Sequence, residues 1–243
     1  MGKLIAVTGK GGSGKSTVLI NLASAFADAG LSAGCFCCDL RAPSLPIFLN
    51  MEIPRLKSLG KLLTHPAPAS QFMEYQRIKG LFVSSTARGE TCLEYEPPDR
   101  EVIETFLQKL RSAFDIVLVE CPDVLFNSFS ALCIRACDTR VNILSPTPQG
   151  IAWEQACAKM LLELRPSVPP VNVVNGSDPS MKEDDLSRLF GVPVGVFFPY
   201  SEGIRQSALL GEPYYLMGSG RTAKAFRQGM DKLSELLVQG GNA

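Results

Sequence analysis

The stretch VTGKGGSGKST (residues 7–17) lies between an apolar run over residues 3–8 and a helical pattern over residues 15–29. Its glycines permit positive φ angles and close backbone approach, so successive N–H groups can point at an anion near the start of a helix. Apolar side chains recur on one face of the expected helix: Val18, Leu19, Leu22, Ala23 and Phe26. The stretch therefore predicts a strand, a phosphate-binding loop and a helix, in that order.

The spacing Gly9-x4-Gly14-Lys15-Ser16 satisfies the Walker A pattern of nucleotide-binding loops. Lys15 is expected to reach the β- and γ-phosphates, and the Ser16 hydroxyl to ligate Mg²⁺. The predicted phosphate-binding residues are Gly11, Gly12, Ser13, Gly14, Lys15, Ser16 and Thr17. A second lysine, Lys10, is not required by this pattern.

Apolar runs alternate with helical patterns along the rest of the chain. Further strands are predicted at 32–38, 80–84, 116–120, 140–144, 171–174 and 192–197, and further helices at 99–113, 127–136, 149–164, 181–190 and 219–238. Runs such as IVLVE (116–120) are apolar throughout, as expected of strands buried on both faces of a parallel sheet. We therefore predict a doubly wound α/β fold with a mostly parallel sheet, and one nucleotide-binding domain over residues 1–243.

The composition of the chain indicates which binding partners and which cellular compartment to expect. Lys plus Arg and Asp plus Glu each total 24, so no overall field favours nucleic acid or an anionic membrane. No run of about 18 apolar residues is present, and the loop begins by residue 9, which leaves no room for a signal peptide. We expect a cytoplasmic protein whose eight cysteines are mostly buried reduced thiols.

The loop GKGGSGKST resembles the deviant Walker A motif of the MinD/ParA-type ATPases, a group within the SIMIBI class of P-loop proteins. The resemblance spans nearly the whole chain and implies ATP and Mg²⁺ as ligands. In most of that family the first lysine, here Lys10, crosses a dimer interface and contacts phosphates held by the partner subunit. By resemblance, Lys10 and Lys15 are catalytic lysines, and the chain forms a homodimer when ATP is bound.

Two acidic positions depart from the family pattern. The family usually has Asp-x-Asp after the second strand. By resemblance Asp39 is the second acid, a catalytic residue that positions Mg²⁺ or the attacking water, and Cys37 replaces the first acid. In FDIVLVECPD (114–123), Glu120 stands where the Walker B aspartate is usual, with Pro122 retained. Ser16, Asp39 and Glu120 are thus the expected Mg²⁺ residues. A longer carboxylate and a missing one predict slow hydrolysis.

The nucleotide base has its own candidates. Asn175 ends VNVVN at the place of the family asparagine whose amide reads adenine, which suits a group that both donates and accepts. Pro199 and Tyr200 match the loop beside the purine, although Tyr200 could equally be a core aromatic. Cys121, between Glu120 and Pro122, is the thiol expected closest to the nucleotide.

Several functions remain open at this level. The leading hypothesis is an ATP-driven dimerisation switch that positions or regulates a cellular assembly, and the main alternative is a nucleotide-binding scaffold that has lost most hydrolysis. A metal-delivery ATPase needs cysteine ligands in a pattern that is not evident here. The stretch DLRAPSL (39–45) resembles the bacterial tyrosine-kinase branch, so autokinase activity is a further hypothesis. Kinases of that branch usually end in a cluster of tyrosines, whereas the last tyrosine here is Tyr215.

The C-terminal region bears on DNA and membranes. Four basic residues could share a helix face and bind DNA: Arg221, Lys224, Arg227 and Lys232. The final residues, LLVQGGNA, do not form the basic amphipathic helix expected of a membrane anchor.

Overall fold

The computed structural model describes residues 1–40, 43–124, 128–164, 169–178 and 180–239. Within them, eight strands form one sheet in the order β3-β4-β2-β5-β1-β6-β7-β8, parallel throughout except that β3 is antiparallel to β4. The strands are β1 (Lys3–Gly9), β2 (Ala33–Cys37), β3 (Met73–Glu74), β4 (Leu81–Ser84), β5 (Ile116–Glu120), β6 (Thr139–Leu144), β7 (Val171–Ser177) and β8 (Val196–Pro199).

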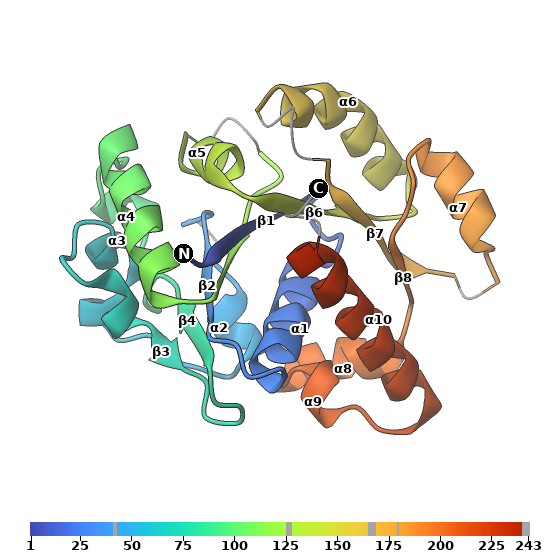
Figure 1. Cartoon of the computed structure of the whole chain (residues 1–243), viewed down its shortest axis with the longest axis horizontal. Coiled ribbons are helices and arrows are strands. Elements are labelled where there is room, and N and C mark those ends of the chain that lie inside the picture. The colour runs from blue at the N-terminus through green and yellow to red at the C-terminus, as the bar shows by residue number, and fades with distance from the viewer. Residues whose placement is uncertain (41–42, 125–127, 165–168, 179, 240–243) are drawn as a thin grey trace.

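Helices cover both faces of this sheet (Figure 1). They are α1 (Lys15–Asp28), α2 (Leu45–Phe48), α3 (Leu59–Leu62), α4 (Arg100–Ala113), α5 (Ser128–Ala136), α6 (Pro148–Leu164), α7 (Glu183–Phe190), α8 (Glu202–Leu210), α9 (Tyr214–Met217) and α10 (Gly220–Gln239), with 3-10 turns η1 (Arg55–Lys57), η2 (Pro68–Gln71) and η3 (Cys92–Glu94). Of the helices in the described ranges, none is both long and apolar enough to cross a membrane. The predicted doubly wound α/β fold is confirmed.

Two cores lie on opposite faces of the sheet because successive strand residues point to opposite sides. In β1, Ile5 and Val7 pack with α1 and α10, whereas Leu4 and Ala6 pack with α4 and α5. A strand in this position has no polar face, which explains its apolar sequence.

The predicted elements are present with shifted ends. The last strand begins at Val196 and not at 192, since Pro193 has no N–H for the ladder and its carbonyl accepts a hydrogen bond from Asn172 Nδ2 (2.9 Å). The short helices α2 and α3 escaped prediction because four residues carry no helical period. Residue 127, the expected start of the helix at 127–136, lies outside the described residues.

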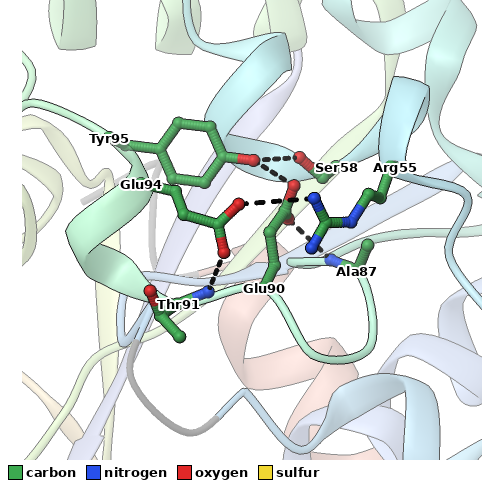
Figure 2. A network of polar contacts seen from close by, with 7 residues as sticks. All are labelled: Arg55, Ser58, Ala87, Glu90, Thr91, Glu94 and Tyr95. Carbon is green, nitrogen blue, oxygen red and sulfur yellow. Dashed lines mark hydrogen bonds and ion pairs between the residues drawn. The ribbon is translucent and has the colours of Figure 1, made fainter.

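A polar network fixes the segment that follows β4 (Figure 2). The Tyr95 hydroxyl donates to Glu90 and lies 2.9 Å from Ser58 Oγ, beside α3. The other Glu90 oxygen accepts a hydrogen bond from the Ala87 amide (2.9 Å), which holds the turn closed. Ala87 and Glu90 also line a cavity of about 690 Å³ beside α2, so the network sets one wall of that cavity.

Candidate functional site

The candidate site lies at the edge of the sheet where the parallel strands end. The loop 9–15 follows β1, and Glu120 and Cys37 are the last residues of β5 and β2. In the strand register Glu120 pairs with Val7 on one side and with Cys37 on the other. The sheet therefore places the loop and the two unusual residues, Glu120 and Cys37, next to one another.

The loop has the backbone of an anion-binding turn. Gly12 and Gly14 have φ angles of 80° and 92°, a conformation that side chains disfavour. A Cβ atom at Gly14 would lie 2.2 Å from Asn175 Nδ2, so this glycine also permits close contact. Lys15 is buried, and its ammonium donates to the Gly9 and Lys10 carbonyls (3.0 and 3.2 Å). The cation is thus held within the loop by backbone oxygens.

Ser16 and Glu120 form a hydrogen-bonded pair. Ser16 Oγ donates to Glu120 Oε1 (2.7 Å) and lies 2.9 Å from Ser44 Oγ. Burial raises the pKa of the Glu120 carboxyl, and the Asp39 charge adds to this rise, against the Ser16 hydrogen bond and the Lys15 charge. The second oxygen, Oε2, is buried and makes no hydrogen bond to any residue that the structure describes. It is a buried acceptor in need of a donor or a cation.

Cys37 stands at the place of the first acid in the Asp-x-Asp pattern. The residue is 4% exposed, and burial, followed by the Glu120 carboxylate, raises the pKa of its thiol. The Asp39 amide donates to Cys37 Sγ (3.4 Å). The structure thus brings Asp39 and Glu120 together and puts a neutral thiol beside them.

A cavity of about 560 Å³ opens beside the loop. Seven predicted binding residues line it: Gly12, Ser13, Gly14, Thr17, Asn175, Pro199 and Tyr200. Asn175 Nδ2 donates to the Ser13 carbonyl (2.8 Å), so this amide lies against the loop itself. Tyr200 is 56% exposed and its hydroxyl donates to Glu202 Oε2 (2.8 Å). Tyr200 is therefore a residue of the cavity and not an aromatic of the hydrophobic core.

Gly11 and Lys10 are predicted site residues that do not line this cavity. The Gly11 amide donates to Asp123 Oδ2 (3.1 Å). Lys10 is half-buried, and its ammonium makes no hydrogen bond or ion pair within the described part of the chain, whereas its carbonyl accepts the Lys15 bond. The two lysines therefore differ: Lys15 points into its own loop, and Lys10 is available to another molecule.

Sequence reasoning missed several residues of this site, and three of them make polar contacts there. Asp123 contacts the loop, Ser44 contacts Ser16, and Arg205 lines the cavity while paired with Glu202. Asp123 stands directly after the conspicuous Pro122, which is the one signal that could have found it. The other two come from loops and helices with no pattern of their own.

The cysteines lie on two faces of the sheet. Cys35 and Cys37 pack in the cluster on the α1 face, whereas Cys38 and Cys121 pack in the opposite cluster, together with Cys133 of α5 and with Cys137. These six are buried as predicted. Cys121, the thiol expected closest to the nucleotide, packs in the second of these clusters, whereas Cys37 lies beside Glu120 in the strand register. Among the residues described, no group of three or more Cys, His, Asp or Glu could hold a metal ion.

The four C-terminal basic residues do not form one equivalent set. Arg221, Lys224 and Lys232 are exposed on α10. Arg227 is half-buried and donates to the Tyr215 carbonyl (2.7 Å) and to the Gly218 carbonyl. Arg227 therefore ties α10 to α9, and only the other three are available to a partner.

We expect Arg227→Ala to destabilise the protein by about 2 kcal/mol, since it removes two hydrogen bonds from a charged donor and leaves carbonyls unpaired. Chemical denaturation measures this change. The matched variant Lys224→Ala should unfold like wild type, and equal destabilisation by both would contradict the structural role of Arg227.

Comparisons with known proteins agree with this geometry. The ParA family profile described as "NUBPL iron-transfer P-loop NTPase" matches residues 1–177. The chain belongs to this ParA family of P-loop NTPases. The resemblance carried by the two-lysine loop is thereby confirmed.

Relatives of this ParA-family chain include two groups. The septum site-determining protein MinD of Thermotoga maritima is 24% identical over 93% of this chain and 86% of its own length. The cytosolic Fe-S cluster assembly factor nubp2 of Danio rerio is 29% identical over 61% of this chain and 56% of its own length.

Solved structures show the same fold. The cell division ATPase MinD of Pyrococcus furiosus superposes with a TM-score of 0.80, at 23% identity, over 97% of this chain and 100% of that one. MinD of Pyrococcus horikoshii, solved in complex with Mg-ADP, has a TM-score of 0.78 at 20% identity, over 100% of this chain and 98% of that one.

Proposed function

We propose that this ParA-family chain is an ATP-binding and ATP-hydrolysing dimerisation switch that positions or regulates a cellular assembly. One observation carries the proposal: the positive-φ loop, the buried Lys15 and the cavity lined by Asn175 and Tyr200 meet at one edge of the sheet. Backbone N–H groups and a lysine suit the phosphates, and an amide beside an aromatic ring suits the base.

The residues present fit Mg²⁺ as well as the nucleotide. Glu120 Oε2 is a buried acceptor with no hydrogen bond to a described residue, and Ser16 Oγ lies beside it. Ser16 would hold the ion directly, and Glu120 and Asp39 would hold its water ligands. When bound, Mg²⁺ neutralises charge on the phosphates. Lys15 would exchange the Gly9 and Lys10 carbonyls for phosphate oxygens, at little cost because the ammonium stays in the loop.

Lys10 supports the dimeric part of the proposal. Its ammonium is not used within the described part of its own chain, although it adjoins the phosphate loop. A second copy facing this loop would receive that charge near its own phosphates. A cation supplied in this way can accelerate phosphoryl transfer by about 10³ to 10⁵.

A second candidate is a nucleotide-binding scaffold with weak or lost hydrolysis. The specific observation is the pair Cys37 and Glu120, where a buried thiol of raised pKa replaces a carboxylate beside a longer acid. Fewer charges around the attacking water reduce its activation. Turnover of wild type no faster than that of Lys15→Ala, with dimerisation intact, would support this candidate.

Metal delivery is weakly supported in this chain, although relatives include Fe-S assembly factors. A cysteine must be deprotonated to bind a metal, and burial raises the pKa of Cys35, Cys38 and Cys133. Autokinase activity has as little support, because Tyr215 is buried and its hydroxyl donates to Asp231 (2.9 Å).

The direct test measures oligomeric state and turnover on the same sample. With ATP and Mg²⁺ the wild type should form a dimer by light scattering and release phosphate, and with ADP it should stay monomeric. A monomer under both conditions would contradict the switch.

Glu120 gives a prediction about pH. Because its pKa is raised in the folded chain, its contribution to stability is fully present below its unfolded pKa and is lost as pH rises through its folded pKa. Glutamine is uncharged and still accepts from Ser16. Without nucleotide or Mg²⁺, Glu120→Gln should therefore melt above wild type at neutral pH, and the gap should close toward about pH 4.

Thermal unfolding as a function of pH measures this difference, and each ~1 kcal/mol appears as about 2–4 °C in Tm for a chain of this size. Glu96→Gln is the control, because Glu96 is exposed. A constant gap between Glu120→Gln and wild type at all pH values would contradict the burial effect.

A further inference from the structure

Asp123 contacts the backbone of the phosphate loop with its carboxylate. Its Oδ2 accepts a hydrogen bond from the Gly11 amide at 3.1 Å. A Cβ atom at Gly11 would lie 2.6 Å from the same oxygen. The φ angle of Gly11 is not in the left-handed region, so its backbone does not itself require glycine. What glycine supplies here is room for an anionic oxygen on the loop.

The Asp123 carboxylate occupies a backbone amide that a phosphate could also use. Amides of a phosphate loop are donors for anions, and a carboxylate oxygen carries the same partial charge and accepts in the same way as a phosphate oxygen. One amide hydrogen cannot serve both well. A phosphate that takes the Gly11 amide must displace the Asp123 carboxylate, and the two anions also repel each other.

Asp123 is in addition linked to helix α6. Its carbonyl accepts a hydrogen bond from Trp153 Nε1 (3.1 Å), and Trp153 lies on α6. Trp153 is the only tryptophan of the chain. A displacement of Asp123 that also moves its backbone carbonyl changes the surroundings of the one indole, and tryptophan fluorescence reports it.

We propose that Asp123 is an internal competitor of the nucleotide: its carboxylate occupies the Gly11 amide in the nucleotide-free chain, and phosphate binding displaces it and shifts the contact with Trp153. The proposal rests on the proposed nucleotide-binding function and adds a regulatory residue to it. The Asp123 carboxylate lowers the affinity for nucleotide. It also couples phosphate binding at the loop to the contact between Asp123 and Trp153 of α6.

The sign of its effect separates this role from a structural one. A residue that merely supports the loop would weaken nucleotide binding when removed, because the loop would lose its shape. A competitor strengthens binding when removed. We expect Asp123→Ala to bind a non-hydrolysable ATP analogue with Mg²⁺ about tenfold more tightly than wild type, the loss of one charge-assisted hydrogen bond. Asp123→Asn keeps an acceptor for the Gly11 amide but not the charge, so its affinity should lie between those of wild type and Asp123→Ala.

The experiment combines calorimetry with fluorescence. Isothermal titration gives Kd for ADP and for the ATP analogue in wild type, Asp123→Ala, Asp123→Asn and the exposed-acid control Glu96→Gln. Tryptophan emission is followed in the same titrations, with Trp153→Phe to define the background. Wild type and Glu96→Gln should show a nucleotide-dependent change in emission that saturates with the calorimetric Kd.

The outcomes separate this proposal from the one it rests on. If wild type binds neither nucleotide, the proposed function and the competitor both fail. If wild type binds but both Asp123 variants, folded by circular dichroism, bind equally or more weakly, the competitor is overturned and nucleotide binding stands. An emission spectrum of wild type that nucleotide leaves unchanged also overturns it.

Discussion

Lys15→Ala is expected to lower nucleotide affinity by roughly a hundredfold or more, because the ammonium is the charge that would meet the phosphates and each charge-assisted hydrogen bond contributes about 1.5–3 kcal/mol. The buried position of Lys15 and its two hydrogen bonds to loop carbonyls hold it there before nucleotide arrives. Isothermal titration with ADP and with an ATP analogue measures the loss.

The control for this variant is Lys79→Ala, which removes an exposed lysine of the same charge. Circular dichroism establishes that Lys15→Ala is folded. If folded Lys15→Ala binds nucleotide as wild type does, the loop does not hold phosphate and the proposed function is wrong.

Lys10→Ala is expected to abolish ATP-dependent dimerisation and to reduce turnover by about 10³ or more, while nucleotide binding to the monomer survives. The Lys10 ammonium makes no hydrogen bond or ion pair within the described part of its own chain. Its loss should therefore leave the fold of the nucleotide-free monomer unchanged. Light scattering, phosphate release and titration on one preparation measure the three properties.

A mixture of two inactive variants decides whether Lys10 acts across the interface. In Lys10→Ala mixed with Lys15→Ala, the first subunit still binds ATP and the second still supplies Lys10. Action across the interface predicts partial recovery of turnover in the mixture. A mixture as inactive as its components would contradict that action and assign Lys10 to its own subunit.

DNA binding can be tested with the structure as a guide. Neutralising Arg221, Lys224 and Lys232 leaves the structural contacts of Arg227 intact. If α10 binds DNA, this triple variant should lose it and keep nucleotide binding, and its salt dependence should weaken with the loss of phosphate contacts. DNA affinity equal to that of wild type would remove α10 from consideration.

The amino-acid sequence by itself determined which functional residues follow which strands along the chain. A glycine loop with two lysines follows one buried strand, Glu120 ends another, and Asn175 ends a third. These features follow from local rules, because buried parallel strands are apolar and phosphate loops need glycine and lysine at set spacings. They sufficed for the fold class and for seven of the residues that line the cavity.

Only the tertiary structure decided which side chains meet. The register of β2 on β5 puts Cys37 against Glu120, and the alternation of strand residues sends Cys121 to the opposite face. The contact of Asp123 with Gly11 joins residues 112 positions apart. No local pattern encodes such a contact, since it depends on how separate strands align and on the space that a missing Cβ leaves between them.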